Sequence, residues 1–125
     1  MNEWIGLSRR AGFKIEDGRI LVSLGERKQL VSVDEQPGPV YRLWSVAVPA
    51  AAARDLAPSA DEFAWERNRK SDLVGFRVDA RNRIIGKAIV PVDDGLDEEE
   101  WRVWVLAVAQ ASDRLEYLVT GRDEQ

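Results

Sequence analysis

The stretch from Leu73 to Gly121 reads LVGFRVDARNRIIGKAIVPVDDGLDEEEWRVWVLAVAQASDRLEYLVTG and decides the fold. Its first part alternates apolar and polar side chains over residues 74–79, reverses at residues 79–82, and continues as a second apolar run over residues 84–92. Alternation with a period of two on either side of a short polar turn is typical of a β-hairpin. We therefore expect two antiparallel strands here.

The second part of this stretch predicts one long amphipathic helix. Asp97 and Glu100 have the spacing of a capping box, in which the two side chains accept hydrogen bonds from free backbone N–H groups. Gly121 is placed to end the helix, because glycine readily adopts the left-handed conformation. Apolar residues recur at spacings of three and four and predict a single stripe that faces the core: Trp101, Trp104, Val108, Ala111, Leu115 and Leu118. Full burial of one large side chain contributes about 1.5–3 kcal/mol, so this helix is expected to lie against a sheet.

The chain before residue 73 predicts a short helix at residues 2–11, then four strands, then a middle helix interrupted at Pro58. The four strands are expected at residues 13–16, 19–24, 29–34 and 40–48, with turns at 17–18 and 25–28 and a loop at 35–39. Ser59 and Glu62 form a second capping box where the middle helix restarts. The fold predicted is α+β, an antiparallel sheet packed by helices in the order α-β-β-β-β-α-β-β-α.

The length and the net charge of the chain limit the classes of protein to which it can belong. A chain of 125 residues with 45% hydrophobic content is expected to form a single domain over residues 1–125. The net charge of −4 argues against nucleic acid as a partner, because non-specific binding to phosphates depends on an excess of Lys and Arg. No apolar run approaches the 18 or so residues that span a bilayer, so we expect a cytoplasmic protein without a membrane partner.

The sequence contains no cysteine and no histidine. Thiolate nucleophiles, sulfur-bound metals and the commonest general base are therefore excluded, and catalysis would depend on carboxylates, Lys or Tyr. The nine glycines are dispersed singly and form no phosphate-binding loop. We expect no enzyme activity and no cofactor.

Two charged clusters have alternative interpretations. The acidic group is a hard-cation site or, as we favour, a set of carboxylates that stabilises a helix N-terminus without a metal: Asp93, Asp94, Asp97, Glu98, Glu99 and Glu100. The basic group either converges on one acidic partner or, as we favour, consists of solvated helix ends and a hairpin tip: Arg9, Arg10, Arg67, Arg69, Lys70, Arg81 and Arg83.

The chain has five tryptophans, which is many for a domain of this size. Each is most simply explained as a core residue, but aromatic side chains also dominate the centres of protein interfaces. We expect at least one, Trp44 or Trp65, to lie at a groove or a subunit contact. Arg42 and Arg77 are further candidate partner-binding residues.

Several short stretches resemble the YbjN-like family. They are Gly75-Phe-Arg-Val-Asp, Ile84-Ile-Gly-Lys-Ala, Leu96-Asp-Glu-Glu-Glu-Trp and Asp113-Arg-Leu-Glu-Tyr-Leu, and upstream Lys28-Gln-Leu-Val-Ser-Val and Arg42-Leu-Trp-Ser-Val. That family is similar in fold to type III secretion chaperones. The resemblance implies a small acidic homodimer that holds other polypeptides.

Three functional hypotheses follow. The first is a non-catalytic, chaperone-like or regulatory binding module whose sheet edge or aromatic groove receives a polypeptide, and which dimerises through a sheet edge or the middle helix. The second is a regulatory domain that binds a small molecule in an apolar pocket between the sheet and the last helix, where Arg42 or Arg77 would orient an anionic group. The third is an enzyme with a carboxylate or Tyr/Lys mechanism.

Overall fold

The computed structural model describes residues 3–38, 40–56, 59–70, 73–92 and 95–120. The elements follow one another as α1 (Glu3–Arg10), β1 (Lys14–Glu16), β2 (Arg19–Leu24), β3 (Arg27–Gln36), β4 (Val40–Val48), α2 (Ala50–Ala53), α3 (Ala60–Asn68), β5 (Gly75–Val78), β6 (Ile84–Pro91) and α4 (Glu98–Thr120). The position expected to end the last helix, Gly121, lies outside the described residues.

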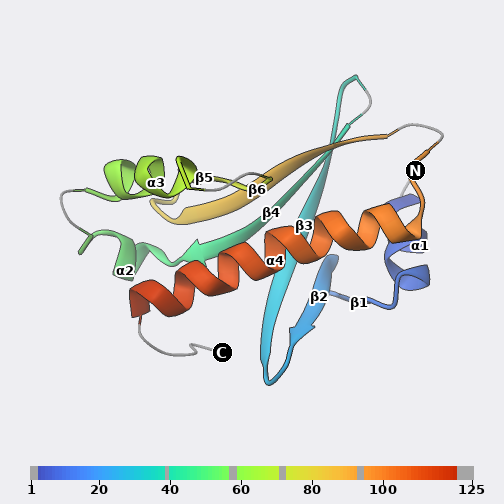
Figure 1. Ribbon diagram of the computed structural model, residues 1–125, viewed down its shortest axis with the longest axis horizontal. Coiled ribbons are helices and arrows are strands. Elements are labelled where there is room, and N and C mark those ends of the chain that lie inside the picture. The colour runs from blue at the N-terminus through green and yellow to red at the C-terminus, as the bar shows by residue number, and fades with distance from the viewer. Residues whose placement is uncertain (1–2, 39, 57–58, 71–72, 93–94, 121–125) are drawn as a thin grey trace.

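The six strands form one sheet in the order β1-β2-β3-β4-β6-β5, and every neighbouring pair is antiparallel. The α+β class with an antiparallel sheet is therefore confirmed. Strands that follow one another along the chain are neighbours except at the crossover through α2 and α3, which places β5 at the far edge with β6 beside β4 (Figure 1).

The turns between the first strands follow from their residues. Asp17 and Gly18 join β1 to β2 with φ of 53° and 74°, the two positive values that a type I′ hairpin turn requires. The next turn is shorter than predicted. Arg27 already pairs with Leu24, so only Gly25 and Glu26 form the turn, and the prediction of a turn over residues 25–28 is wrong in length.

Strand β3 joins two parts of the sheet. Its residues 27–31 pair with β2, and its residues 32–36 pair with β4. At the point of change, Gln29 and Ser45 satisfy backbone groups of the diverging strands. The Gln29 Nε2 donates to the Val46 carbonyl at 2.7 Å, and the Ser45 hydroxyl donates to the Leu30 carbonyl at 2.7 Å. The long β3 thus carries the sheet from one part to the other (Figure 1).

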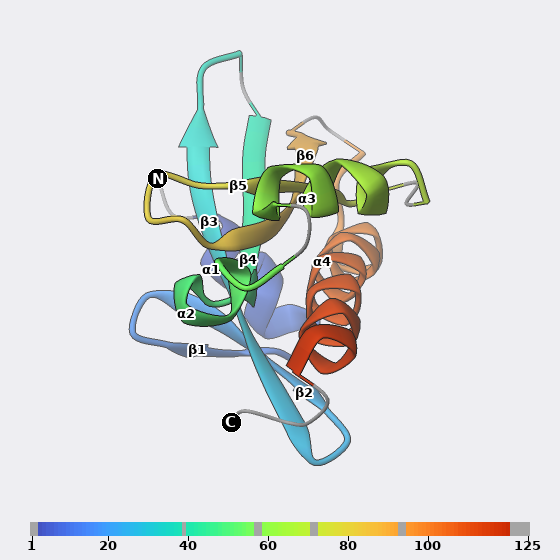
Figure 2. The same cartoon turned by 90° about the vertical axis from the view of Figure 1, so that its left-hand side faces the viewer.

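Helix α4 lies across one face of the sheet (Figures 1 and 2). The Asp97 carboxylate accepts a hydrogen bond from the Glu100 backbone N–H at 2.9 Å, so the predicted N-cap contact is present. The helix approaches β6 closely at Gly86, where an added Cβ would lie 2.5 Å from the Ser112 hydroxyl oxygen. Glycine is therefore required at this position by the packing of the helix.

The buried face of α4 differs from the predicted stripe. Trp101, Val108 and Leu115 are buried as expected, but Leu118 is 58% exposed, and Trp104 and Ala111 are only partly buried. The remaining buried positions are Val105, Ala109, Ser112 and Asp113. The predicted stripe is wrong on one side because several apolar residues continue around the helix, so spacing alone does not locate the centre of the buried face.

Trp101 connects α4 to α1 and to the sheet. Its side chain is fully buried, and its Nε1 donates to the Ser8 hydroxyl at 2.8 Å. That hydroxyl donates in turn to the Trp4 carbonyl at 2.6 Å. The rings of Tyr41 and Trp101 meet edge to face with centroids 5.4 Å apart. Because its polar atom is satisfied, this large side chain is buried without an unpaired donor.

The middle helix consists of two helices. Pro58, the predicted break, lies outside the described residues, but the Ser59 hydroxyl accepts from the Glu62 N–H at 3.2 Å as the capping box predicts. Helix α3 packs along β5, where Asn68 Nδ2 donates to the Phe76 carbonyl at 2.8 Å and Asn68 Oδ1 accepts from the Phe76 N–H. Asn68 thus occupies outward backbone groups of an edge strand.

Candidate functional site

The two faces of β4 carry different side chains. Tyr41, Leu43, Ser45 and Ala47 are buried, and they alternate with residues that point away from α4 and are only partly buried: Val40, Arg42, Trp44 and Val46. We call the side of the sheet opposite α4 the outer face. The register of β4 with its neighbours places Ser32 and Asp34 of β3, and Lys87 and Ile89 of β6, on the same face.

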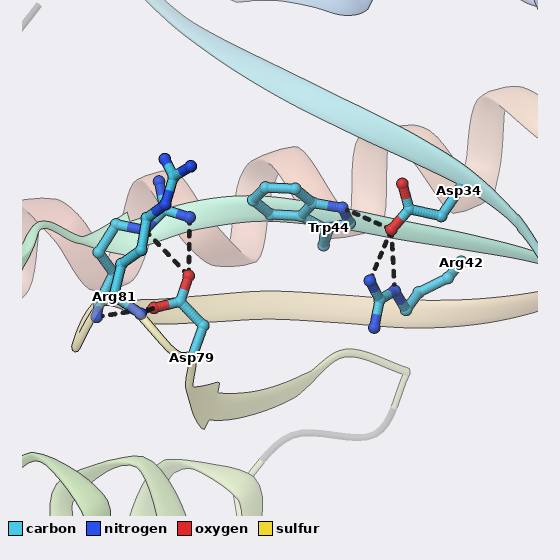
Figure 3. Close-up of polar contacts among 6 residues, drawn as sticks. Asp34, Arg42, Trp44, Asp79 and Arg81 are labelled. Carbon is cyan, nitrogen blue, oxygen red and sulfur yellow. Dashed lines mark hydrogen bonds and ion pairs between the residues drawn. The ribbon is translucent and has the colours of Figure 1, made fainter.

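Asp34 holds two side chains of the outer face. Its Oδ2 accepts from Arg42 Nη2 at 2.6 Å and Nε at 3.2 Å, and from Trp44 Nε1 at 3.1 Å (Figure 3). Asp34 and Arg42 are directly opposite each other in the β3–β4 ladder. The Asp34 carboxylate on β3 therefore holds the guanidinium and the indole ring of two residues of β4.

Asp79 organises the turn between β5 and β6 in the same way. Its Oδ1 accepts from the backbone N–H groups of Arg81 and Arg83 at 3.0 and 2.9 Å, and its Oδ2 accepts from Arg83 Nη2 at 2.7 Å and Nε at 2.9 Å (Figure 3). Burial by itself would raise the pKa of Asp79, but these hydrogen bonds and the Arg83 charge outweigh it and lower the pKa below 3.8. The turn therefore carries a fixed ionised carboxylate.

Trp44 lies between these two pairs. The Arg83 guanidinium carbon is 5.7 Å from the centroid of the Trp44 ring, and Arg42 shares Asp34 with the Trp44 N–H. Around this ring the outer face is hollowed over a volume of about 440 Å³. The lining comes from β2, β3, β4, β5, β6 and the β5–β6 turn: Arg19, Ser32, Arg42, Trp44, Arg77, Asp79, Ala80, Arg81, Arg83 and Ile85. We refer to this site as the arginine hollow.

Two further cations on the outer face form no ion pair within the described residues. They are Arg77 of β5 and Lys87 of β6, and Lys87 lies opposite Trp44 in the ladder. Burial lowers the pKa of Lys87, and the charges of Arg77 and Arg42 lower it further. The cations are thus close enough to repel one another, and a bound anion would relieve that repulsion.

The structure brings together three of the four residues expected at a partner site. Arg42, Trp44 and Arg77 all line the arginine hollow. Trp65 does not line it. This side chain lies on α3, is 59% exposed, and has the Arg69 guanidinium 5.1 Å from its ring centroid. Of the other tryptophans, Trp4 and Trp101 are core residues.

Sequence reasoning missed the two carboxylates that orient the site. In the sequence, Asp34 has the pattern of an ordinary strand residue and Asp79 that of a turn residue. A signal was present for the first of them, because a hairpin centred on the Pro-Gly-Pro loop places Asp34 opposite Arg42. Arg81 and Arg83, which we assigned to a solvated tip, line the hollow.

The remaining charged clusters are divided among separate contacts. Arg10 pairs with Glu98 at 3.0 Å, Arg69 with Glu66 at 3.1 Å, and Arg102 with Glu99 at 2.7 Å. Asp93 and Asp94 lie outside the described residues, and in the part of the chain that is described no group of acidic side chains is arranged to hold a metal ion.

A second hollow of about 500 Å³ lies beside α4, at the β2–β3 turn. It is lined by Leu24, Arg27, Gln110, Asp113, Arg114 and Tyr117. Arg27 and Asp113 form an ion pair at 2.8 Å, and the Asp113 side chain is only 7% exposed. The space between the sheet and α4 is itself filled by the buried side chains of the core.

No family model matches the chain, and no curated protein is significantly similar to it. Among the described helices, none is long and apolar enough to cross a membrane. Evidence on function therefore comes from the geometry of the outer face.

Proposed function

We propose that this chain is a non-catalytic polypeptide-binding module that receives an acidic segment of a partner on its outer face. The observation that carries the proposal is a partly exposed Trp44 fixed by Asp34 among arginines of three elements. Aromatic and arginine side chains are the residues that most often dominate binding energy at protein interfaces. Here both kinds are held in place before a partner arrives.

Charge supports an acidic partner. The whole chain carries −4, yet the hollow and its immediate neighbours contain six cations and two carboxylates: Arg19, Arg42, Arg77, Arg81, Arg83 and Lys87, against Asp34 and Asp79. The hollow and these neighbours therefore carry an excess of four positive charges within an acidic protein. Such a local field attracts acidic segments and repels basic ones.

The face of the sheet supports binding better than its edges do. One edge is β1, which has three residues, and the other is β5, which has four. The Phe76 N–H and carbonyl on the outside of β5 are already bonded to Asn68. A partner strand would therefore find few free backbone groups at either edge.

We also propose that the module is a homodimer of the YbjN-like, chaperone-like kind. The antiparallel sheet packed by helices is consistent with that resemblance. Light scattering is expected to give twice the chain mass of 14.1 kDa, and a mass of one chain at micromolar concentration would contradict the dimer.

Photo-crosslinking tests polypeptide binding. A photoreactive p-benzoylphenylalanine replaces Ile89, which is 47% exposed on the outer face and lies opposite Arg42. The matched control places it at Val103, 59% exposed on α4. In cell extract, position 89 is expected to give adducts with other polypeptides that disappear with Trp44→Ala. Equal adducts at both positions, or none at position 89, would contradict the proposal.

The second candidate function is binding of a small molecule, and the hollow beside α4 favours it. It combines the Tyr117 ring and the Arg27 guanidinium in a volume of about 500 Å³, which suits a small ligand. Thermal-shift screening with small organic anions is expected to raise Tm if this function holds, and Tyr117→Ala should remove the shift.

A further inference from the structure

In the arginine hollow, the Trp44 ring lies between arginine side chains on two sides. In Figure 3 the Trp44 ring lies between Arg42 on one side and Arg81 with the Asp79 carboxylate on the other. The distances agree with this order, because Arg42 and the Trp44 N–H share Asp34, while Arg83 lies over the ring at 5.7 Å. A ligand that covers the ring therefore meets a guanidinium at either end.

Each of the two flanking guanidinium groups keeps a free donor. Arg42 and Arg83 both use Nε and Nη2 to bind their carboxylates. Nη1 of each has no partner among the described residues. Because Asp34 and Asp79 already restrict the two side chains, little side-chain entropy is lost when these donors bind a second carboxylate.

The spacing along β4 matches an extended peptide. Arg42 and Trp44 are two residues apart on one strand and face the same side, which places their backbones about 6.5 Å apart. An extended segment repeats side chains on one face at the same interval. Residues i and i+2 of such a segment can therefore lie over Arg42 and Trp44. Residue i+4 then extends toward Arg83, whose guanidinium carbon is 5.7 Å from the centroid of the Trp44 ring.

We propose that the segment received by the arginine hollow is an extended peptide with the pattern acid–x–apolar–x–acid, its apolar side chain on Trp44 and its two carboxylates on Arg42 and Arg83. The inference rests on the proposed function and makes it specific. Arg77 and Lys87, which form no ion pair within the described residues, add attraction for both acids. A peptide with a single acidic residue can bind only one of the two guanidinium groups, and the other keeps only its contact with Asp34 or Asp79.

Two peptides of identical composition and charge test the pattern. Thr-Glu-Thr-Phe-Thr-Glu-Thr places both acids on the face of the phenylalanine, whereas Thr-Thr-Glu-Phe-Glu-Thr-Thr places them on the opposite face. Each peptide carries a fluorescent label, and binding to the full chain is measured by anisotropy. The first peptide is expected to bind at least about tenfold more tightly than the second, since the loss of one charge-assisted hydrogen bond is worth about that factor.

Arginine variants assign the contacts. Arg42→Gln and Arg83→Gln are each expected to weaken the first peptide about tenfold and to leave the second unchanged, because glutamine still donates to Asp34 or Asp79 but lacks the charge. Arg9→Gln on α1, an exposed arginine outside the hollow, is the matched control and should change neither affinity. Circular dichroism checks that each variant is folded.

The outcomes separate this inference from the proposed function. Equal affinity for the two peptides, or a preference that survives both arginine variants, overturns the pattern while crosslinking at position 89 can still support polypeptide binding. Binding of neither peptide also overturns the pattern. Absence of crosslinks at position 89 in the chain that retains Trp44 overturns the proposed function whatever the peptides do.

Discussion

The two faces of β4 differ in how their side chains are held in place. Toward α4, Leu43 and Ala47 are fully buried among apolar neighbours. On the outer face, the Arg42 side chain is 34% exposed and Trp44 is partly buried, and both donate hydrogen bonds to Asp34. The core face is stabilised by the apolar surface that it removes from water. The side chains of the outer face are held by hydrogen bonds to carboxylates.

The largest expected effect is on the core face. Trp101→Ala removes a fully buried ring together with its hydrogen bond to Ser8 and its contact with Tyr41. It is expected to lower the free energy of unfolding by about 3–5 kcal/mol, measured by urea denaturation. Trp65→Ala, at a side chain 59% exposed, is the control and should change stability by less than about 1 kcal/mol. Similar losses for the two variants would contradict the assignment of the core.

Gly86 gives the next largest effect on that face. Gly86→Ala places a Cβ 2.5 Å from the Ser112 hydroxyl oxygen and 3.2 Å from the Phe76 ring, so the Ser112 side chain or α4 must shift. A loss of about 1–3 kcal/mol is expected in thermal or urea denaturation. Ser112→Ala removes an oxygen that is buried without a hydrogen-bond partner among the described residues. It should therefore restore part of the loss in the double variant, and no restoration would contradict this contact.

On the outer face, Asp79→Asn tests the carboxylate that fixes the β5–β6 turn. The variant is expected to cost about 2 kcal/mol at neutral pH, because charge-assisted hydrogen bonds from Arg83 are weakened. The folded pKa of Asp79 lies below 3.8, so this stabilisation is present above that pH and is lost as the pH falls through the folded pKa. Unfolding curves of the two proteins should therefore converge in acid. A difference that stays constant down to pH 2 would contradict the pKa shift.

The smallest effect is expected at Leu118. Because its side chain is 58% exposed, Leu118→Ser should change the monomer's stability by less than about 0.5 kcal/mol. Leu115→Ser, one turn earlier and 1% exposed, is the matched comparison and should cost several times more. Equal effects in urea denaturation would show that the predicted stripe, not the observed buried face, contacts the core.

Local patterns in the sequence predicted the elements well and their faces less well. The hairpin over β5 and β6, the Asp97 and Ser59 caps and the Asp17-Gly18 turn all follow from residues close together in the chain. The buried face of α4 does not, because Trp104 and Leu118 extend the apolar surface beyond the width of the sheet contact. How much of an apolar side chain of α4 is buried depends on which residues of other elements pack against it, and spacing along the helix does not contain that information.

The candidate site was predicted in part. Arg42 and Trp44 share a face because they are two residues apart on one strand, and this much is visible in the sequence. Arg77 joins them only through the strand order β4-β6-β5, which depends on where the crossover places β5. Asp34 contacts Arg42 across one hairpin and Asp79 contacts Arg83 four residues away, but only the strand order β4-β6-β5 brings Asp79 and Arg83 near Trp44.

The sequence by itself determined the α+β class, the positions of the strands and the helix caps, because these depend on periodicity and on contacts within a few residues. The sequence also contains no histidine and no cysteine, which limits the catalytic and metal-binding groups to other side chains. Only the tertiary structure decided which side of α4 is buried and which arginines surround Trp44. Those outcomes depend on strand order and helix docking, where the burial of distant side chains against one another outweighs local preference.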